Sequence, residues 1–400
     1  MFSLIRQTTM MVRIGLLGLR RRVAISLSMA LSIMLVVIVL AGFLSMAKGF
    51  EEALEGSGSP QIAVILGGTT RQETSSNLSE EIIRSIMATR DDLGLSRDAK
   101  GELIASRELV VAVDFTPEGE TEATRVAVRG MDSAGPFLRD TSKLSQGRLF
   151  RKGAQELVVG EDLAAKLPGL AVGEKIRLGS VSWTVVGHLS AKGGVFGSEL
   201  WGDLDAVRSA FARQGDVQSL RLRLEAATAL DRLRSKLATS TTEPLTLLTE
   251  AKLYSDQSAR TVKLIRVFGW PISLLMALGA TAGALNTMAS SVSARTIEIA
   301  TVRALGFSRF SAFASTWVES IVLSGCGALA GIGLSMLIFN GWQASTIGAN
   351  NARMAFTFAV TGDVVLACGL LGLAIGILGG MVPAMAAARM PLMDALRARS

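Results

Sequence analysis

The chain has 400 residues, of which 49% are hydrophobic, and it carries a formal net charge of +7. A mean hydropathy of +0.42 is too high for two or three soluble domains of that total length and points to a membrane protein. The charge excess does not indicate a nucleic-acid-binding protein. Residues 47–266 contain 29 Lys and Arg against 30 Asp and Glu, so the excess belongs to the rest of the chain.

Four apolar runs are long enough to cross a lipid bilayer as helices. Each reaches the roughly 18 residues, with few charges, that a membrane-spanning helix needs. We therefore expect spans at residues 24–46, 268–289, 313–339 and 364–388. The first run follows several arginines and could also belong to a signal peptide. Its apolar stretch exceeds the roughly 7–15 residues of such peptides, which favours an uncleaved anchor.

Basic residues cluster before the first span, between the second and third spans, and after the fourth. Because positively charged segments stay on the cytoplasmic side, we expect both termini in the cytoplasm of a multi-pass membrane protein. In chain order this predicts a cytoplasmic amphipathic segment (1–23), the first span (24–46), an extracytoplasmic domain with its stalk (47–267), the second span (268–289), a cytoplasmic loop with a coupling helix (290–312), the third span (313–339), an extracytoplasmic loop (340–363), the fourth span (364–388) and a cytoplasmic tail (389–400).

The segment 47–267 alternates short strand patterns with amphipathic helix patterns. We expect strands at 61–66, 108–115, 124–129, 156–159, 175–178, 182–186 and 220–224, and helices at 79–90, 161–167 and 227–237. Ser79 is placed to cap the first of these helices, and Gly179 and Ser180 to form a hairpin turn. The fold class is therefore an α-helical membrane protein with four transmembrane helices and an α+β extracytoplasmic domain inserted between helices 1 and 2.

The stalk of this domain, residues 249–267, contains neither Gly nor Pro and leads directly into the second span. That composition favours one continuous helix, which would couple the domain to the span. A short helix followed by a hinge is the alternative.

The sequence lacks the signatures of an ATPase, a metal site or a catalytic triad. The nearest match to a phosphate-binding loop, between Gly169 and Lys175, has the wrong spacing and no hydroxyl residue after the lysine. His188 is the only histidine, and we expect it to make a structural hydrogen bond. The many carboxylates are typical of a solvated surface. We therefore expect no enzyme activity, no metal and no cofactor in this chain, with any ATP and Mg²⁺ bound by a separate subunit.

Glycines four residues apart occur in three of the expected spans. Such glycines let helix backbones approach closely in lipid, where hydrophobic burial does not drive helices together. We expect helix packing at Gly279, Gly283, Gly327, Gly331, Gly372, Gly376 and Gly380. The alternative is that glycine is simply frequent in membrane helices.

Glu319 lies about two turns inside the third span, where an unpaired acid is costly. The other spans offer almost no ionisable partners for it. We expect an interfacial or helix-packing role rather than a proton relay, and no hydrophilic path through the spans.

The loop between the second and third spans contains a charged helix pattern. On a helical wheel, Ile297, Ala300, Ala304 and Leu305 fall on a side that would face lipid or the bundle. The opposite side gathers Arg295, Glu298, Ile299, Val302 and Arg303, and Gly306 is placed to end the helix. Apolar side chains among charges on the wet face indicate a docking surface for a partner protein. A helix lying on the membrane surface is the alternative.

The order of one span, a large domain and three closely spaced spans resembles the MacB/LolC/FtsX-type permeases of ATP-binding cassette (ABC) systems. The resemblance covers nearly the whole chain. It is carried by the run Arg-Thr-Ile-Glu-Ile-Ala-Thr-Val-Arg-Ala-Leu-Gly at 295–306, with support from the basic approach to the first span at 19–22, Gly147-Arg148, 156–160, 185–187 and the ending 391–397.

The resemblance implies an inner-membrane permease subunit that dimerises with a second copy or a paralogue and binds a cytoplasmic ABC ATPase dimer through the coupling helix. That ATPase would bind ATP and Mg²⁺, and its motion would reach the periplasmic domain, which extracts or exports a lipoprotein, lipid, peptide or toxin. A periplasmic adaptor or an outer-membrane protein is a further partner in this class. Two alternatives are an FtsX-like regulator that activates a cell-wall hydrolase without transport, and a membrane-anchored extracytoplasmic enzyme.

Overall fold

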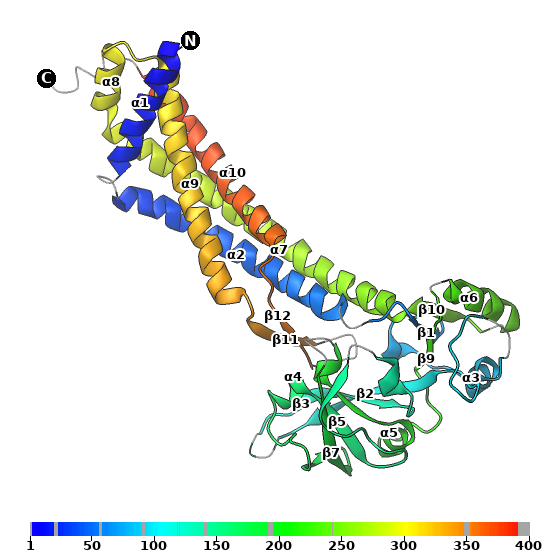
Figure 1. The fold of residues 1–400 in the computed structure, drawn as a ribbon. Coiled ribbons are helices and arrows are strands. Elements are labelled where there is room, and N and C mark those ends of the chain that lie inside the picture. Colours follow the sequence, from blue (N-terminus) through cyan, green and yellow to red (C-terminus); the bar gives the residue numbers. More distant parts are fainter. Residues whose placement is uncertain are drawn as a thin grey trace. The chain divides into compact units, whose positions relative to one another are not determined.

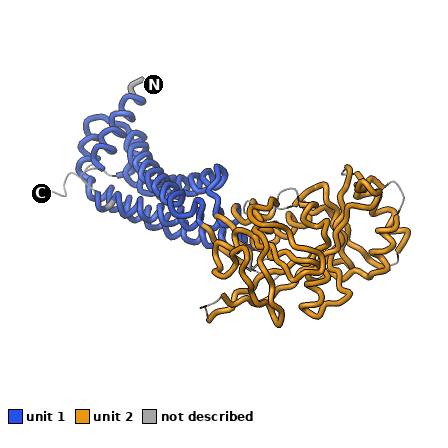
Figure 2. Tube along the Cα trace, turned by 60° about the horizontal axis from the view of Figure 1, so that its bottom comes forward, with its two compact units in different colours: residues 1–48, 263–342, 358–400 blue, residues 49–262, 343–357 orange. Residues whose placement is uncertain are grey.

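The computed structural model describes residues 2–19, 23–55, 58–89, 93–117, 119, 121–139, 142–190, 195–226, 228–241, 243–347 and 353–390. The chain divides into two compact units (Figure 2). Unit 1 comprises residues 1–48, 263–342 and 358–400, and unit 2 comprises residues 49–262 and 343–357. The predicted basic positions 20–22 and the predicted tail motif 391–397 lie outside the described residues.

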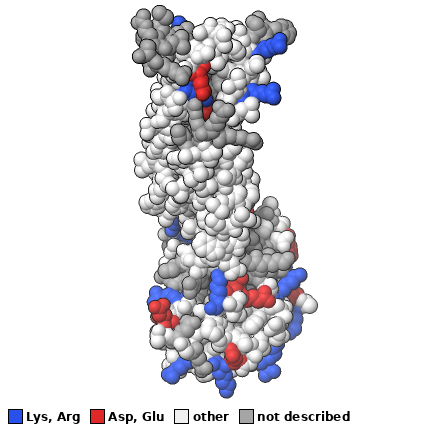
Figure 3. Space-filling model, turned by 90° about the vertical axis from the view of Figure 1, so that its left-hand side faces the viewer, with Lys and Arg blue, Asp and Glu red and all other residues white. Residues whose placement is uncertain are grey.

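Unit 1 is a bundle of helices (Figure 1). Two of them are short, α1 (Phe2–Gly18) and α8 (Thr296–Ala304). The others are α2 (Val23–Glu55), α7 (Glu250–Ala294), α9 (Arg309–Phe339) and α10 (Gly362–Arg389), and within the described residues these four are long and apolar enough to cross a membrane. On the face shown in Figure 3, charged side chains lie at the end of unit 1 that carries α1 and α8, and the surface below them is mostly uncharged. The four predicted spans are therefore present.

The helix α7 begins at Glu250 and continues through Pro271 to Ala294 without a break. The predicted continuous helix is thus confirmed. One helix carries the chain from the last strand of the inserted domain to the loop that contains α8.

Helix α9 uses its glycines to approach α2. A Cβ atom added at Gly327 would lie 2.6 Å from the carbonyl oxygen of Ala30, and one added at Gly331 would lie 2.8 Å from a methyl carbon of Val37. Both distances are far below van der Waals contact, so any larger residue would push the two helices apart. The structure therefore places these two glycines in a helix contact inside the chain.

The glycines of α10 face α9 in the same way. Added Cβ atoms would lie 2.6 Å from Ala328 at Gly372, 1.9 Å from the Ser324 hydroxyl oxygen at Gly376, and 2.4 Å from Ser320 at Gly380. Gly279 and Gly283 of α7 differ, because no atom lies within 4 Å of a Cβ added at either position. Their face of α7 has no neighbour among the described residues of this chain.

We expect Gly376→Ala to destabilise unit 1 by about 1–3 kcal/mol, because the added methyl group overlaps Ser324 and cannot be accommodated without moving α9. Gly369→Ala in the same helix is the matched control, since its nearest atom would be 3.9 Å away. Thermal unfolding of the purified chain in detergent measures the difference. Equal unfolding temperatures for the two variants would contradict close packing at Gly376.

Unit 2 is built on one mixed sheet with helices packed against it. Its strands in the order of the described sheet are β10 (Leu245–Thr249), β1 (Ile62–Gly67), β9 (Ser219–Arg223), β2 (Ala105–Phe115), β3 (Thr124–Met131), β8 (Glu199–Asp203), β5 (Glu156–Gly160), β7 (Val181–Ser190) and β4 (Lys143–Gly147), with β6 (Lys175–Leu178) beside β7. The helices are α3 (Glu80–Met87), α4 (Glu161–Ala164), α5 (Leu204–Ala210) and α6 (Ala229–Ser240), and the short 3₁₀ turns are η2 (Glu73–Ser75), η3 (Gly135–Leu138) and η4 (Val195–Ser198).

Short sequence patterns predicted several of these elements correctly. The Ser79 hydroxyl accepts a hydrogen bond from the Ile82 N–H and caps α3. The strands β6 and β7 pair around the predicted turn at Gly179, which has a positive φ of 61°. The predicted helix 161–167 is shorter than expected, and β4, β8, β10 and α5 are elements that the sequence patterns did not predict.

The predicted loop 340–363 contains a hairpin that the sequence patterns did not predict either. Its strands are β11 (Gln343–Ile347) and β12 (Arg353–Thr357), and it belongs to unit 2 although it lies between α9 and α10 in the sequence. Phe356 packs edge to face on Phe50 at 5.6 Å, and the Ala355 N–H donates a hydrogen bond to the Ser198 hydroxyl. The hairpin thereby helps to complete unit 2.

Candidate functional sites

The loop between α7 and α9 contains the predicted short helix, α8, and the ends of α8 lie where the sequence predicts them. The residue before α8, Arg295, leaves the helical conformation with φ −118° and ψ 23°. The helix ends at Ala304, and Gly306 follows with a φ of 100°, a conformation that favours glycine. The charged segment is therefore a separate short helix rather than an extension of the second span.

The predicted wet face of α8 is turned inward. Ile299 is only 6% exposed and packs with Met11 of α1, with Ala312 of α9 and with Ala387 of α10, while Val302 is half-buried against the same cluster. The prediction that Ile299 projects into the cytoplasm is therefore wrong. The reason is that α1 and α9 cover this side of the helix, so its apolar residues complete the core of unit 1.

Two predicted coupling arginines are also buried and anchor α8 to the bundle. The Arg295 guanidinium forms an ion pair with the carboxylate of Glu319 in α9. The Arg303 guanidinium donates a hydrogen bond of 2.7 Å to the backbone carbonyl of Met390. Glu319 is thus buried and paired, as a packing role requires. Among the five predicted coupling residues, Glu298 is the one that is exposed.

The opposite side of α8 is exposed. Its exposed residues lie within about one third of a helical turn and form what we call the outer face of α8: Ile297, Glu298, Thr301, Ala304 and Leu305. Leu305 is 76% exposed and Ile297 is 43% exposed. An exposed apolar pair with a carboxylate beside it has the composition of a small docking surface.

A second candidate site is a cluster of buried charges in unit 2. At its centre, the Arg129 guanidinium on β3 contacts three carboxylates, at 2.8 Å from Glu199, 2.9 Å from Glu108 and 3.2 Å from Glu73. All four side chains are at least nine-tenths buried. The prediction that the carboxylates lie on a solvated surface is therefore wrong for these three residues.

The cluster extends to two further arginines and to the first residue of α7. Arg139 pairs with Glu108 at 2.6 Å, and Arg221 of β9 pairs with Glu73 at 2.6 Å. Arg221 also pairs with Glu250, the residue that begins α7. The start of the long helix is therefore fixed to the sheet by a buried ion pair.

The arginines keep the carboxylates of Glu73 and Glu108 ionised. Burial by itself raises the pKa of Glu73, but Arg129, Arg221 and the Ser219 hydroxyl outweigh it and hold that pKa well below its usual range. Burial likewise raises the pKa of Glu108, and Arg139, Arg221 and Arg129 lower it to about 2. Since a lowered pKa stabilises the fold above the pKa of the unfolded chain, Glu73 and Glu108 contribute stability at neutral pH and lose that contribution in acid.

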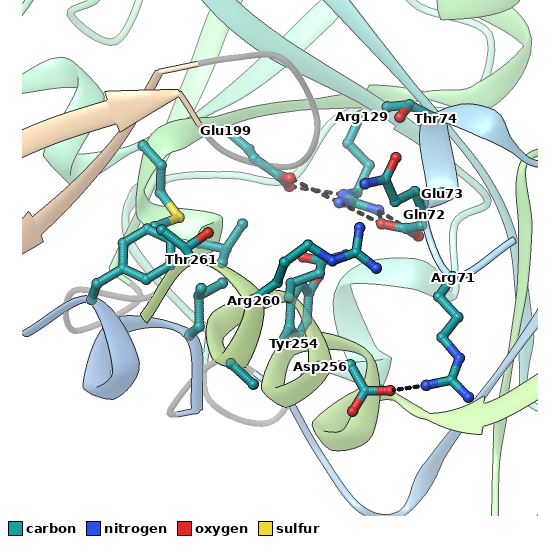
Figure 4. Close-up of a pocket in the computed structure, with 16 residues that line it drawn as sticks. Arg71, Gln72, Glu73, Thr74, Arg129, Glu199, Tyr254, Asp256, Arg260 and Thr261 are labelled. Carbon is teal, nitrogen blue, oxygen red and sulfur yellow. Dashed lines mark hydrogen bonds and ion pairs between the residues drawn. The ribbon is translucent and has the colours of Figure 1, made fainter. Parts of the chain in front are cut away.

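Beside this cluster, unit 2 contains a cavity of about 350 Å³ (Figure 4). Glu73, Arg129 and Glu199 form its charged wall, and Tyr254 and Arg260 of α7 lie opposite. The predicted structural hydrogen bond of His188 lies elsewhere in unit 2, where its Nε2 is 2.7 Å from the carbonyl oxygen of Leu170. Among the described residues, no group of three or more His, Cys, Asp or Glu side chains is arranged to hold a metal ion.

Comparison with known proteins assigns both parts of the chain to described families. Residues 24–240, more than half of the chain, match the family described as the MacB-like periplasmic core domain. Residues 270–392 match the family described as the FtsX-like permease C-terminal region.

Curated relatives resemble the chain at low identity. The macrolide export ATP-binding/permease protein MacB 1 of Aeromonas hydrophila is 27% identical over 271 residues, which cover 64% of this chain and 41% of that protein. The uncharacterized ABC transporter permease YknZ of Bacillus subtilis is 23% identical over 347 residues, which cover 80% of this chain and 82% of that protein. The chain thus spans about two fifths of the length of the first relative and most of the second.

Two solved structures are similar to the inserted domain. The extracellular domain of the ABC-type transporter YknZ has 16% identity and a TM-score of 0.35, covering 47% of this chain and 99% of that one. The periplasmic region of MacB from Actinobacillus actinomycetemcomitans has 14% identity and a TM-score of 0.36, covering 53% of this chain and 96% of that one.

Proposed function

Because the chain belongs to the MacB-like, FtsX-type family of ABC transporter permeases, we propose that it transmits ATP-driven motion from a separate ATPase to the domain inserted between its first two spans. The ATPase, which binds ATP and Mg²⁺, docks on the outer face of α8 in the cytoplasm. The inserted domain uses the motion on the far side of the membrane to extract or export a lipoprotein, lipid, peptide or toxin.

The observation that carries this proposal is the continuity of α7. The helix starts at Glu250, which is ion-paired to the sheet of the inserted domain through Arg221, and ends at Ala294, next to α8. A displacement of α8 would therefore act on a helix whose other end is fixed in the inserted domain.

The proposal includes a second permease subunit, which is either another copy or a paralogue. Gly279 and Gly283 support it, because these glycines of α7 lack a neighbour among the described residues of the chain. The exposed residues around them include Leu275 and Leu278, both 68% exposed. A partner helix would cover this face closely at the two glycines.

We expect positions 152 and 301 to lie on opposite sides of the membrane. Lys152 of unit 2 and Thr301 on the outer face of α8 are both exposed, so cysteines introduced there should react freely with a maleimide. In a background that lacks Cys326 and Cys368, Lys152→Cys should react with a membrane-impermeant maleimide from outside the membrane. Thr301→Cys should react only after permeabilisation. Labelling of both positions from one side would refute the proposed orientation.

A further inference from the structure

The cavity in unit 2 is large enough to hold a small ligand or the head of a larger one. Its volume of about 350 Å³ lies at the lower end of the range for ligand sites, which is on the order of 300–1,000 Å³. Residues from distant parts of the sequence enclose it, including the end of α2, the turn η2, strands β3, β8 and β12, and the first turns of α7. The cavity is therefore a product of the fold and not of one flexible loop.

The carboxylates in its wall are already neutralised. The oxygens of Glu73 accept hydrogen bonds from Arg129, Arg221 and Ser219. The oxygens of Glu199 accept hydrogen bonds from Arg129 and from the Trp201 indole N–H. A cationic ligand would have to compete with these buried guanidinium groups, so the wall does not favour a cation.

Two polar groups at the cavity can contact a ligand. Figure 4 shows the Arg260 side chain, which is exposed to solvent, reaching across the cavity toward Arg129 and Glu73. Tyr254 is 2% exposed, and its hydroxyl has no hydrogen-bond partner among the described residues. A buried hydroxyl without a partner is costly, so a ligand that accepts from it would remove that cost.

A third part of the wall is apolar. Phe50 and Leu54 at the end of α2 and Met354 of β12 line the cavity, and each is at most 4% exposed. Val195 of η4 lies beside them. An alkyl chain would find hydrocarbon contacts here, in the same cavity that the Arg260 guanidinium reaches.

We propose that this cavity binds an amphiphilic anion, a carboxylate or phosphate group that carries an alkyl or acyl chain. Arg260 pairs with the anionic oxygens, the Tyr254 hydroxyl donates to the same group, and the chain packs against Phe50, Leu54 and Met354. This inference names a substrate class for the proposed function. It rests on the proposed function only for the movement of the ligand after binding, because binding itself needs no ATPase.

The test uses the full chain in phosphatidylcholine nanodiscs without ATPase or ATP, and equilibrium binding of radiolabelled octyl phosphate corrected for empty nanodiscs. We expect saturable binding that octyl glucoside and octylamine do not compete away, and inorganic phosphate should bind at least ~10-fold more weakly. Competition by octylamine, or equal affinity for inorganic phosphate, would overturn the proposal. Adding phosphatidylglycerol to the nanodiscs distinguishes the sources. Competition then identifies a membrane lipid, and unchanged binding identifies a soluble amphiphile.

Two variants assign the site. Arg260→Ala should weaken octyl phosphate binding by at least ~10-fold, whereas Arg177→Ala, which removes an exposed arginine from β6, should leave binding unchanged. Tyr254→Phe should weaken binding ~3-fold or more and leave the unfolding temperature unchanged or higher, because it deletes a hydroxyl that lacks a partner. Full binding by Arg260→Ala would refute the site. The labelling pattern of positions 152 and 301 does not depend on this ligand. The proposed function can therefore be refuted or supported independently of the proposed ligand site.

Discussion

Replacing Arg129 with alanine is expected to lower the free energy of unfolding of the inserted domain by about 3–5 kcal/mol, because it leaves buried carboxylates without their shared partner. Glu199 would keep only the Trp201 N–H among its hydrogen bonds described above, whereas Arg139 and Arg221 would still pair with Glu108 and Glu73. For a domain of this size the loss corresponds to roughly 10 °C in unfolding temperature. Trypsin pulses at rising temperature, with the fragments of residues 58–249 identified by mass spectrometry, measure it.

The control is Arg125→Ala on the same strand. Arg125 also forms an ion pair, at 3.0 Å from Asp114, but both side chains are more than half exposed. Water screens such a pair, so little change in the unfolding temperature is expected. Arg129→Lys keeps the charge but loses the forked geometry that reaches several carboxylates, and should fall between the two. If Arg129→Ala unfolds at the same temperature as Arg125→Ala, the buried cluster does not hold the domain together.

The elements that the sequence predicts well are those whose signals are local. The strand 175–178 was located to the residue, because its alternation and the following Gly179 turn lie within a few positions. The strands that were missed depend on distant partners. β8 (Glu199–Asp203) pairs with β3, some 70 residues earlier, and its own sequence includes a glycine and two acids that weaken the pattern.

The buried charge cluster could not be predicted from the sequence, because it also depends on residues that are distant along the chain. Glu73, Arg129 and Glu199 come together only when η2, β3 and β8 meet, and nothing in the spacing of these residues along the chain indicates that they meet. One signal was available. Arg129 follows Val128 in β3 and Arg221 lies between Leu220 and Leu222 in β9, and a charge among apolar residues of a strand must be paired or exposed.

The outer face of α8 shows how a correct periodicity can still mislead. The helical wheel grouped Ile299, Val302 and Arg303 on one side, and the structure also places them on one side. The direction of that side was wrong, because it depends on α1, whose Met11 packs against Ile299. Amphipathic patterns define faces, whereas the neighbouring elements decide which face is buried.

Because the outer face of α8 is the exposed one, a charge placed there should disrupt binding of the ATPase. We expect Leu305→Asp to abolish co-purification of the ATPase that accompanies the unmodified chain, while the variant still inserts into the membrane and unfolds at the normal temperature. Leu305 is 76% exposed, so the fold does not depend on it. A carboxylate buried at the centre of a docking surface costs about 2 kcal/mol or more, which corresponds to roughly 30-fold in affinity. Quantitative affinity purification with a tag on the permease measures the loss.

The matched variants separate docking from folding. Ile299→Asp places a charge in the cluster with Met11 and Ala312, so it should lower the unfolding temperature of unit 1 and reduce ATPase binding only as a consequence. Leu305→Met keeps an apolar side chain on the outer face and should retain the ATPase. Full ATPase binding by Leu305→Asp would move the docking surface away from this face. If Ile299→Asp instead unfolds at the normal temperature but no longer binds the ATPase, the ATPase contacts the inward side of α8.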